Sequence, residues 1–517
     1  MEIRGGKKFF KHSLYFRFRE KERKKLMCGI IGGYNINQII LPLVAGAIRQ
    51  QNRGHDSAGA VVYPKKGEPL SVTKSGRIGE IFTDARIQRL MSGVTGVLQN
   101  KYATTGGAQD KTNRQPFTRR YVYDGHTEFL TIAHNGNFTD PLVGMMETTS
   151  DSELPLKNFE GTDQNKPIEE RIFQALGTLH GAFSLLFVHR GGQGKISLVV
   201  ARDPYGFRPL CFGRYNGSYV FASESVALSG IGCEFERFVE PGEIIVVDED
   251  GFRSYRPALW QNFPRKFCIF EYIYFAHPCS MVETSDGSET YVWQIRRELG
   301  KMLATENPWL EQQIDALCPI PNSATVHGIG LANAIGLPLE NAIIRNEGSA
   351  RTFIAPTGVI RNAAEGEMEE LALHILRKFS FLPNALIDRR AGLVDDSIVR
   401  GNTMRCIVGL LKKFNQNLIK DLSVLIASEP IINPCFYGIR ITSREELAYN
   451  QAEQDTEKLS RRLGVRQTVY LSNQGQSTVA SKCTGMCASS FCQACFNGQY
   501  PTPIEHMRSD YRQAIGV

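Results

Sequence analysis

The sequence predicts two large domains of mixed α and β structure, an α+β domain followed by an α/β domain. Its 517 residues exceed what one hydrophobic core normally serves, which favours two or three domains. Residues 28 to about 255 contain many short β-rich runs separated by Gly, Asp and Asn, a pattern typical of packed antiparallel sheets. From about 268 to 470, apolar strands alternate with helical stretches, which predicts a parallel sheet covered by helices.

Individual elements follow from these patterns. The β-rich runs of the first part include ISLVVARDP (196–204), SYVFASESVAL (218–228) and EIIVVDEDG (243–251). In the second part the predicted strands are IDALCPIP (314–321), ENAIIRN (340–346), GLVDD (392–396) and DLSVLIASEP (421–430), and the predicted helices are 365–379 and 403–414. We therefore expect domains at 28–260 and 261–470. Residues 471–517, rich in Ser, Gly and Cys without periodicity, are expected to be an unstructured tail with a cysteine pair.

The basic charge is confined to one end of the chain. Residues 1–26 hold ten Lys and Arg against three Glu, which accounts for the whole net charge of +7. The body of the protein is neutral overall and has no electrostatic reason to bind nucleic acid. Residues 1–27 lack the apolar stretch of a signal peptide. They are open to interpretation as a targeting peptide, a surface arm, a cleaved pro-segment, or a region upstream of a start at Met27.

Composition indicates a protein of a reducing compartment. With 42% apolar and 22% charged residues it is ordinary for a globular protein, and no apolar run approaches the roughly 20 residues that span a bilayer. Twelve cysteines are too few for a dense disulfide framework at this length. We expect a cytoplasmic protein without a membrane segment, in which clustered cysteines serve metal binding or catalysis.

Cys28 follows Met27 and opens the sequence CGIIGG. A cysteine at the first position of a mature chain can use its own α-amine as the base, so it needs no separate histidine. This chemistry requires removal of everything before Cys28, which is simple if translation starts at Met27. On its own, the pattern also fits a buried structural cysteine.

Four motifs follow in order: RGHDSAG (53–59), KYATTGG (101–107), AHNGNF (133–138) and TSDSE (149–153). With CGIIGG they resemble the glutamine-binding domain of amidotransferases with an N-terminal nucleophile, an αββα sandwich. The resemblance makes Cys28 the nucleophile. The turn-rich HNG sequence can bring a side-chain amide and a backbone N–H together, as an oxyanion hole requires. By resemblance, Asn135 and Gly136 take this role.

The same resemblance assigns the ends of glutamine. Asp151 would hold the α-ammonium group. Where the family has an arginine for the α-carboxylate, this chain has Lys101, which keeps the charge but loses the two-pronged geometry. We expect His134 to be positional, because the N-terminal amine makes a histidine base unnecessary.

The second domain carries GLVDDSIVRGNT at 392–403. A strand ends in Asp395 and Asp396, and a short loop then leads into a helix whose N-terminal N–H groups can bind a phosphate. The string resembles the signature of type I phosphoribosyltransferases. The resemblance implies that the two aspartates face ribose hydroxyls and organise Mg²⁺ with a pyrophosphate, assisted by Ser323 in PNS. The substrate loop would comprise Ser397, Ile398, Val399, Arg400, Gly401, Asn402 and Thr403.

Together the two halves resemble the amidophosphoribosyltransferases over roughly residues 28–505. The strings ARDPYGFRPL, FASES, EPGE, CIFEYIYFAHPCS, ARTFIAP, PCFYGI and CFNGQYPTPI lie in the family's order. Hexose-phosphate transaminases that use glutamine share the first half but have no VDDSIVRGNT, and asparagine synthetases share only the nucleophile logic. The resemblance implies that ammonia released at Cys28 reaches C1 of phosphoribosyl pyrophosphate (PRPP) through a closed passage. Tyr274 and Ile354 are candidates to line it.

The second domain departs from the family's pattern in several places. Arg351 remains in the mobile loop RNEGSARTFI (345–354), but an Arg-Tyr pair has become Glu347 and Gly348, and a basic stretch has become EGEMEEL (365–371). Carboxylates near a pyrophosphate oppose its binding. Two further departures are His277 and Cys279, in place of an arginine and an aspartate. Gly392 replaces an aliphatic residue and is expected to weaken its strand.

Four cysteines match the iron–sulfur cluster branch of the family: Cys268, Cys435, Cys492 and Cys495. Four thiolates suit a 4Fe–4S cluster, which would pin the tail to the body of the protein. Two alternatives remain open: no cluster, as in some relatives, or a zinc site that includes Cys483 and Cys487.

The resemblance implies an enzyme that makes 5-phosphoribosylamine, glutamate and pyrophosphate from PRPP, glutamine and water, the first step of purine synthesis. Its implied partners are these substrates, inhibiting purine nucleotides and copies of the chain in a dimer or tetramer. The departures leave a second hypothesis: an impaired relative that binds PRPP or nucleotides or regulates a partner subunit.

Overall fold

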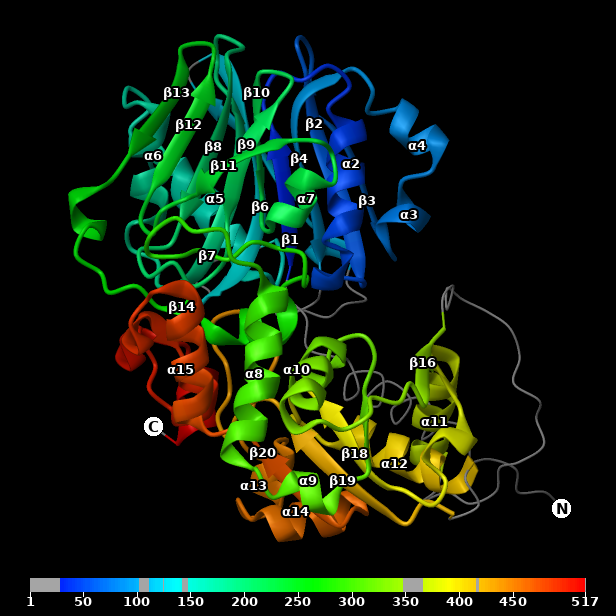
Figure 1. Cartoon of the computed structure of the whole chain (residues 1–517). Helices are drawn as coiled ribbons and strands as arrows, with labels where there is room; N and C mark the ends of the chain where they lie inside the picture. The colour runs from blue at the N-terminus through cyan, green and yellow to red at the C-terminus, as the bar shows by residue number, and fades with distance from the viewer. Residues whose placement is uncertain are drawn as a thin grey trace, which may run out of the picture.

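The computed structural model describes residues 28–101, 111–123, 125–141, 147–346, 366–414 and 418–516. Two antiparallel sheets form the first domain, at the top of Figure 1, and a parallel sheet with its helices forms the second domain below it. The long helix α8 (Val292–Glu306) runs from the junction between the domains down into the second one (Figure 1).

A seven-stranded and a six-stranded antiparallel sheet build the first domain. The larger sheet has the order β11 (Glu234–Phe238), β9 (Cys211–Tyr215), β10 (Ser218–Ala222), β1 (Gly29–Gly33), β4 (Gly93–Lys101), β2 (Ser57–Pro64) and β3 (Leu70–Ser75). The smaller sheet has the order β13 (Gly251–Tyr255), β12 (Ile244–Asp248), β8 (Ile196–Arg202), β7 (Gly181–Arg190), β6 (His126–Phe138) and β5 (Phe117–Tyr123).

The burial of these strands shows why the domain is layered. Strands β1, β4, β7 and β12 are buried along their whole length, so both faces must be covered. One core that includes Ile30, Leu186 and Phe212 lies between the sheets. Helices α2 (Ile40–Arg49), α3 (Ile78–Ile81), α4 (Asp84–Gln88) and α7 (Ser225–Ser229) accompany the larger sheet, and α5 (Leu154–Glu160) and α6 (Ile168–Leu176) pack on the smaller one. The predicted αββα sandwich is confirmed.

The second domain is built on a four-stranded parallel sheet in the order β15 (Ala316–Pro319), β18 (Arg390–Asp395), β19 (Asp421–Ile426) and β20 (Gln467–Tyr470). Two cores cover it. One includes residues of α8 and α10 (Thr325–Ile335), and the other includes residues of α12 (Asn402–Phe414) and α14 (Thr456–Leu463). Short helices α9 (Leu310–Gln313) and α13 (Ala448–Gln451) complete this part. The predicted parallel sheet covered by helices is confirmed.

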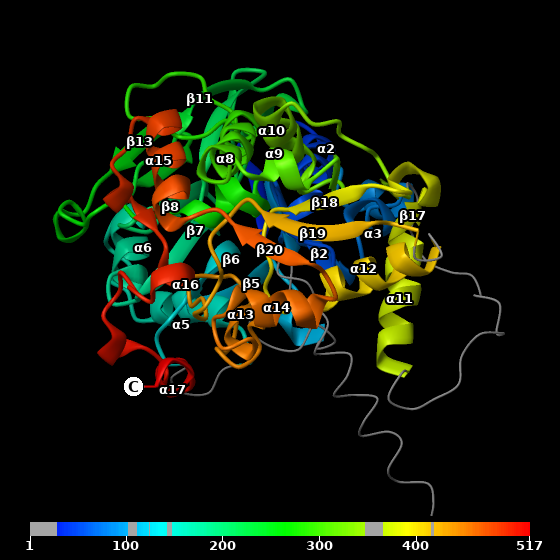
Figure 2. The same ribbon diagram turned by 60° about the horizontal axis from the view of Figure 1, so that its bottom comes forward.

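One predicted strand takes a different place. The segment ENAIIRN forms β16 (Ile343–Arg345), which pairs antiparallel with β17 (Phe379–Phe381), outside the parallel sheet. Helix α11 (Gly366–Lys378) leads into β17 and packs beside it. Figure 2 shows α11 and β17 together at the end of the domain that lies away from the C-terminal helices. No helix among the described residues is long and apolar enough to cross a membrane.

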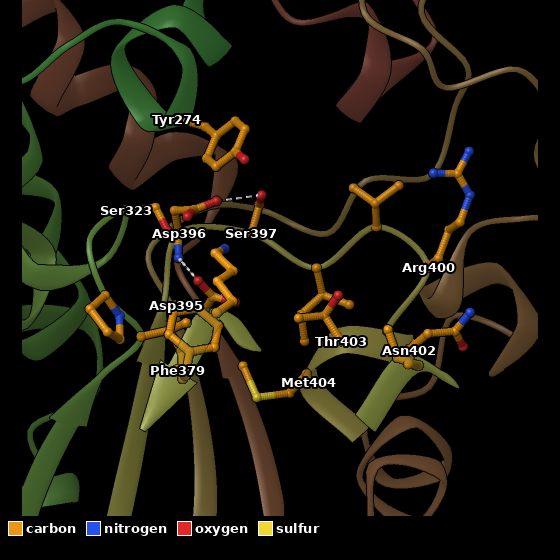
Figure 3. A pocket seen from close by; sticks show the side chains of 17 residues that line it. Tyr274, Ser323, Phe379, Asp395, Asp396, Ser397, Arg400, Asn402, Thr403 and Met404 are labelled. Atoms are coloured by element: carbon orange, nitrogen blue, oxygen red, sulfur yellow. Dashed lines mark hydrogen bonds between the residues drawn. The ribbon is translucent and has the colours of Figure 1, made fainter. Parts of the chain in front are cut away.

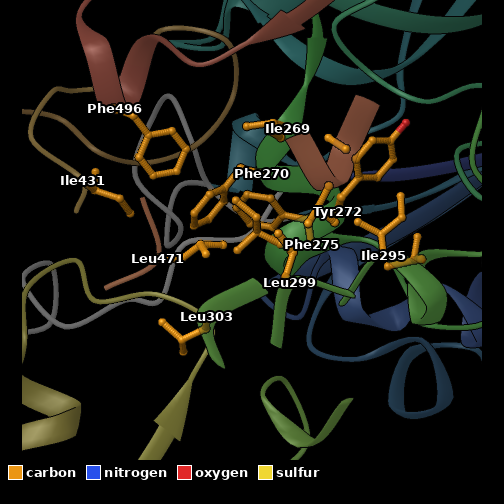
Figure 4. Packing of buried hydrophobic residues seen from close by; sticks show 14 of the residues in the cluster. Ile269, Phe270, Tyr272, Phe275, Ile295, Leu299, Leu303, Ile431, Leu471 and Phe496 are labelled. Carbon is orange, nitrogen blue, oxygen red and sulfur yellow. The ribbon is translucent and has the colours of Figure 1, made fainter. Parts of the chain in front are cut away.

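The expectation of an unstructured tail is wrong. Residues 473–484 form helix α15 (Asn473–Thr484), which begins at Ser472 with a side-chain cap on the N–H of Gly475 and ends at Gly485 in the left-handed conformation. The tail adds β21 (Phe491–Cys492), α16 (Ala494–Asn497) and α17 (Ser509–Ile515), and β21 pairs in parallel with β14 (Phe267–Cys268). Figure 4 shows Phe496 of the tail among Phe270, Ile431 and Leu471. The tail is therefore part of the core.

A buried ionic network joins the two domains. Arg53 donates to Glu224 at 2.5 Å and to Glu271 at 2.6 Å. Glu271 opens a π-helical turn (Glu271–Phe275) and also lies 3.3 Å from Arg208. The side chains of these arginines and glutamates are almost completely buried. Because a buried charge without a partner is costly, the network fixes how the turn meets the first domain.

Candidate active site

Cys28 is buried at the entrance to β1. The strand continues between β10 and β4, and the next residue, Gly29, pairs with Asn100. A Cβ atom on Gly29 would lie 2.5 Å from Oδ1 of Asn100, so a larger residue would force the side chain of Asn100 to shift. The CGIIGG pattern therefore has a steric reason beside the predicted nucleophile.

The residues of the predicted oxyanion hole lie on β6. Gly136 has φ +153°, and a Cβ atom there would lie 2.0 Å from the carbonyl oxygen of Ala182. Nδ2 of Asn135 lies 3.5 Å from Oγ of Ser223, which also accepts the N–H of Ile30 at 3.1 Å. Ser223 thus connects the strand after Cys28 with the strand of Asn135.

The sequence predicts no role for Ser223, which lies in the FASES string. The hydroxyl of Ser223 acts across a separation of 193 residues from Ile30, and its own N–H donates to the carbonyl of Ile30 at 2.9 Å. Ser223 is 0% exposed, and its hydroxyl contacts residues of two strands. Such contacts between distant residues cannot be recognised from the sequence. Within the sequence, its position in a family string was the one available signal.

Asp151 and Lys101, the predicted contacts for the two ends of glutamine, are both buried. Asp151 starts the short helix η3 (Asp151–Glu153), and its Oδ2 accepts the N–H of Phe138 at 2.8 Å. Lys101 ends β4 and donates from Nζ to the carbonyl of Asn113 at 2.7 Å. The Lys101 ammonium group is held by this hydrogen bond and provides a single positive charge, without the paired donors of an arginine.

His134 links these groups. Its Nδ1 lies 2.8 Å from Oγ of Ser152 and 3.9 Å from Oδ2 of Asp151. Burial lowers the pKa of His134, Asp151 acts in the opposite direction, and Lys101 lowers the pKa further. Lys101 and Asp151 thus act on His134 in opposite directions. A buried, neutral imidazole that is hydrogen-bonded to Ser152 agrees with the positional role that we predict for His134.

A cavity of about 170 Å³ lies at the carboxyl end of β18, where the GLVDDSIVRGNT motif predicted a phosphoribosyl site (Figure 3). Every residue from Asp395 to Thr403 lines it. Asp395 accepts the N–H of Asp396 at 3.0 Å, and Asp396 accepts the hydroxyl of Ser397 at 2.7 Å. Ligands commonly bind outside the carboxyl ends of parallel strands.

The loop of residues 397–401, which follows the two aspartates, lines the cavity. Gly401 has φ +75° just before α12 begins at Asn402, and Asn402 and Thr403 of the first helical turn line the cavity. Arg400 lines the cavity and forms an ion pair with Glu446. The N-terminus of α12 therefore lies at the cavity, where its dipole would favour an anion.

Residues distant in the sequence complete the cavity. Tyr274 from the π-helical turn and Ser323 from the PNS motif both line it (Figure 3). Lys378 and Phe379, which sequence reasoning missed, lie at the same cavity, with Nζ of Lys378 4.5 Å from the ring centre of Phe379. No motif marks them, because they lie at the end of α11 and the start of β17, outside the motif that contains the aspartates.

Several predicted positions have a different or undescribed environment. Arg351 and Ile354, with Glu347 and Gly348, lie outside the described residues, and so do the side chains of 365–370. Within the described chain, His277 and Cys279 are not among the residues that line the cavity. The N–H of His277 instead donates to Glu224 at 2.7 Å.

Gly392 does not weaken its strand as expected. A Cβ atom on Gly392 would lie 2.9 Å from side-chain carbons of Leu317 and Leu425, which belong to the strands on either side. The missing side chain therefore leaves room for two large leucines, and β18 remains a central strand of six residues.

The four predicted cluster cysteines gather where the tail meets the domain junction. Cys268 and Cys492 are paired in the β14–β21 register. Burial, with smaller contributions from Glu271 and Cys435, raises the pKa of Cys268 to about 11. Burial, Cys435, Cys495 and Cys492 all raise the pKa of Tyr500. In the described part of the chain, no three His, Cys, Asp or Glu side chains surround a point where a single metal ion could bind.

The fold and these sites define a glutamine amidotransferase domain joined to a phosphoribosyltransferase-type domain. A glutamine amidotransferase domain family matches residues 109–230. The chain is 34% identical to amidophosphoribosyltransferase 1, chloroplastic, of Arabidopsis thaliana, over 94% of this chain and 81% of that protein. It therefore belongs to the amidophosphoribosyltransferase family, a family of enzymes.

Solved structures agree. One is a glutamine PRPP amidotransferase from Bacillus subtilis complexed with ADP and GMP, with a TM-score of 0.78, 30% identity, and coverage of 92% of this chain and 98% of the other. A second, described as the allosteric regulatory enzyme of purine biosynthesis, has a TM-score of 0.80, 29% identity, and coverage of 94% and 97%.

Proposed function

We propose that this chain uses its two sites in one reaction, PRPP + glutamine + water → 5-phosphoribosylamine + glutamate + pyrophosphate. One observation carries the proposal. The π-helical turn that places Tyr274 at the cavity of the second domain begins with Glu271, which is held by Arg53 of the first domain. The π-helical turn therefore connects the first domain, through Arg53, with the cavity of the second domain, through Tyr274.

In the first half-reaction, the thiol of Cys28 attacks the glutamine amide carbon after its proton passes to the α-amine of the same residue. Asn135 and the N–H of Gly136 stabilise the oxyanion. The C–N bond breaks, ammonia leaves, and water then hydrolyses the thioester to glutamate. Asp151 and Lys101 hold the amino-acid end of the substrate. This scheme requires a mature protein that starts at Cys28.

In the second half-reaction, ammonia attacks C1 of PRPP and pyrophosphate leaves. Residues 397–403 bind the 5-phosphate, and Asp395 and Asp396 face the ribose hydroxyls. The two carboxylates and the hydroxyl of Ser323 are oxygen ligands of the kind that Mg²⁺ prefers, and the ion would neutralise the pyrophosphate charge. We propose that Arg351 binds the pyrophosphate as well, and that Tyr274 and Ile354 line the ammonia passage.

The four cysteines Cys268, Cys435, Cys492 and Cys495 are proposed to hold a 4Fe–4S cluster with a structural role. Cys268 and Cys492 are paired across β14 and β21, and Cys435, Cys492 and Cys495 lie within electrostatic reach of Tyr500. Cys268, Cys492 and Cys495 are buried, and Cys435 is partly buried. Four sulfurs around a cubane are farther apart than four around one ion, which agrees with a set that does not converge on a single point.

We further propose that the reaction is the first step of purine synthesis, in the cytoplasm. Purine nucleotides would inhibit it, since a relative was solved with ADP and GMP. The chain is proposed to assemble as a dimer or tetramer.

The test is PRPP-stimulated glutaminase activity of anaerobically purified protein. Wild-type protein should release glutamate faster when PRPP and Mg²⁺ are added, and Cys28→Ala should not. Cys211→Ala, which changes a buried cysteine of the same sheet, is the matched control and should remain active. Equal, slow glutamate release by the wild type and Cys28→Ala would favour the alternative of an impaired binding or regulatory subunit. Mass spectrometry of the mature N-terminus tests the requirement at Cys28.

A further inference from the structure

The C-terminal helix α17 contacts the strand that carries the oxyanion turn. Nδ2 of Asn137 donates to the hydroxyl of Tyr511 at 3.1 Å and to the carbonyl of Phe436 at 2.8 Å. The N–H of Arg508 donates to the carbonyl of Thr139 at 2.9 Å. Figure 2 shows α17 on the side of the molecule where α5 lies. Three segments far apart in the sequence thus meet directly after Gly136.

Aromatic packing makes this contact rigid. The ring of Tyr511 stacks on Phe436 with centroids 4.7 Å apart and an interplanar angle of 18°. Tyr500 packs on Phe436 as well, at 4.8 Å. The buried cluster includes Ala182, whose carbonyl blocks any side chain at Gly136. The tail therefore lies directly behind the turn.

The loop that contains Phe436 also approaches the turn through its backbone. A Cβ atom on Gly438, which has φ +108°, would lie 3.2 Å from the carbonyl carbon of Gly136. Such close approach of two backbones leaves the turn little room to move toward the second domain.

Charge connects the same helix to the glutamine pocket. Burial raises the pKa of Tyr511 to about 12, and Asp151 contributes to this rise. Asp151 also favours the charged form of Arg508. Asp151 in turn accepts the N–H of Phe138. At the end of β6 and the residue after it, Asn135 to Thr139 thus combine the proposed oxyanion hole, the hydrogen bonds to the C-terminal segment and the contact to Asp151.

We propose that Tyr511 is a positioning residue for glutamine hydrolysis, acting through Asn137 on the oxyanion turn. The inference rests on the proposed function. The hydroxyl of Tyr511 and the carbonyls of Phe436 and Phe138 are the acceptors around the amide nitrogen of Asn137, so the C-terminal helix helps to fix this side chain. A fixed Asn137 restrains the backbone directly before it, including the N–H of Gly136, which must meet charge that develops only in the transition state.

The experiment compares Tyr511→Phe with Tyr500→Phe. Both lose one hydroxyl in the same aromatic cluster, but the Tyr500 hydroxyl donates to the carbonyl of Pro434, which lies outside β6. We expect Tyr511→Phe to lower kcat for glutamine hydrolysis about 3- to 10-fold, the range for one hydrogen bond, with KM for glutamine unchanged. Synthesis of phosphoribosylamine from added ammonia bypasses the turn and should be unchanged. Tyr500→Phe should match the wild type in all three measurements.

A double-mutant cycle with Asn137→Ala tests the route. If Tyr511 acts through Asn137, Tyr511→Phe should cost nothing further in the Asn137→Ala protein. Additive losses in the double variant, or equal kcat values for Tyr511→Phe and Tyr500→Phe, would overturn the inference. A wild-type protein that neither hydrolyses glutamine nor uses ammonia would instead overturn the proposed function.

Discussion

Arg53 of the amidotransferase domain and Glu271 of the π-helical turn form an ion pair, with Nη2 2.6 Å from Oε2 and both side chains 0% exposed. Glu271 also serves Arg208, so its loss would leave two buried guanidinium groups without this partner. Removing one member of a buried pair typically costs about 3–5 kcal/mol. The junction between the domains therefore depends strongly on a single carboxylate.

We expect Glu271→Gln to lower the midpoint of urea unfolding by an amount that corresponds to about 3 kcal/mol. Glu236→Gln is the control, because the pair between Glu236 and Arg214 is exposed and such pairs contribute at most about 1 kcal/mol. Equal midpoints for the two variants would show that the buried network adds no more stability than a surface pair.

Gly136→Ala should abolish glutamine hydrolysis, because the new Cβ atom would lie 2.0 Å from the carbonyl oxygen of Ala182. Displacing one oxyanion donor lowers kcat by about 100-fold or more. Ammonia-dependent synthesis should persist. Gly79→Ala, where a Cβ atom meets nothing within 4 Å, should behave as the wild type. Retention of most glutaminase activity in Gly136→Ala would contradict the assignment of this turn.

Ser223→Ala should reduce glutaminase kcat about 3- to 10-fold, because the variant loses the oxygen shared by Ile30 and Asn135. Ser229→Ala, which removes an exposed hydroxyl bonded within its own helix, is the matched control. The measurement is steady-state glutamate release at saturating glutamine. An unchanged kcat in Ser223→Ala would mean that this serine supports the fold alone.

His180 gives stability a pH dependence. A hydrogen bond to Asp140 at 2.8 Å raises the pKa of His180 above its ordinary value. Since the folded pKa is the higher one, the stabilisation is complete below the unfolded pKa and is lost as pH rises through the folded pKa. The pair is partly exposed, so we expect on the order of 0.5 kcal/mol. His180→Gln should remove this dependence in unfolding curves measured from pH 5 to 8. A dependence of the same size in the variant would assign it to other groups.

Cys492→Ser should lose bound iron and acid-labile sulfide from protein purified without oxygen, if the four-cysteine set holds a cluster. Cys318→Ser, which changes a buried cysteine of β15, should retain both. Zinc in place of iron in the wild type, or iron that survives in Cys492→Ser, would exclude the proposed ligands.

The sequence predicted structure and site correctly where the residues of a candidate site are contiguous in the chain. The VDDS string predicted both the end of β18 and the cavity beside it, because the strand, the loop and the helix are contiguous. Gly392 was misjudged because its reason, the leucines at 317 and 425, lies on neighbouring strands.

The tail was misjudged for a similar reason. Helix α15 has a mostly polar sequence, NQGQSTVASKCT, and no strong apolar face, so periodicity could not reveal it. It is held by its cap at Ser472 and by packing of Val479 and Ala480 in the core that includes α8. Ser223, Lys378 and Tyr511 likewise act through contacts that no spacing in the sequence encodes.

The hydrogen bond between Asn137 and Tyr511 has a consequence for the order of events during synthesis. The ribosome makes the oxyanion turn several hundred residues before α17. A nascent chain that has completed its first domain lacks the clamp, so we expect it to hydrolyse glutamine slowly. Full glutaminase activity then arises only when the phosphoribosyl acceptor site also exists. Incomplete chains, and chains shortened by proteases before residue 508, would release free ammonia from glutamine more slowly than the complete protein.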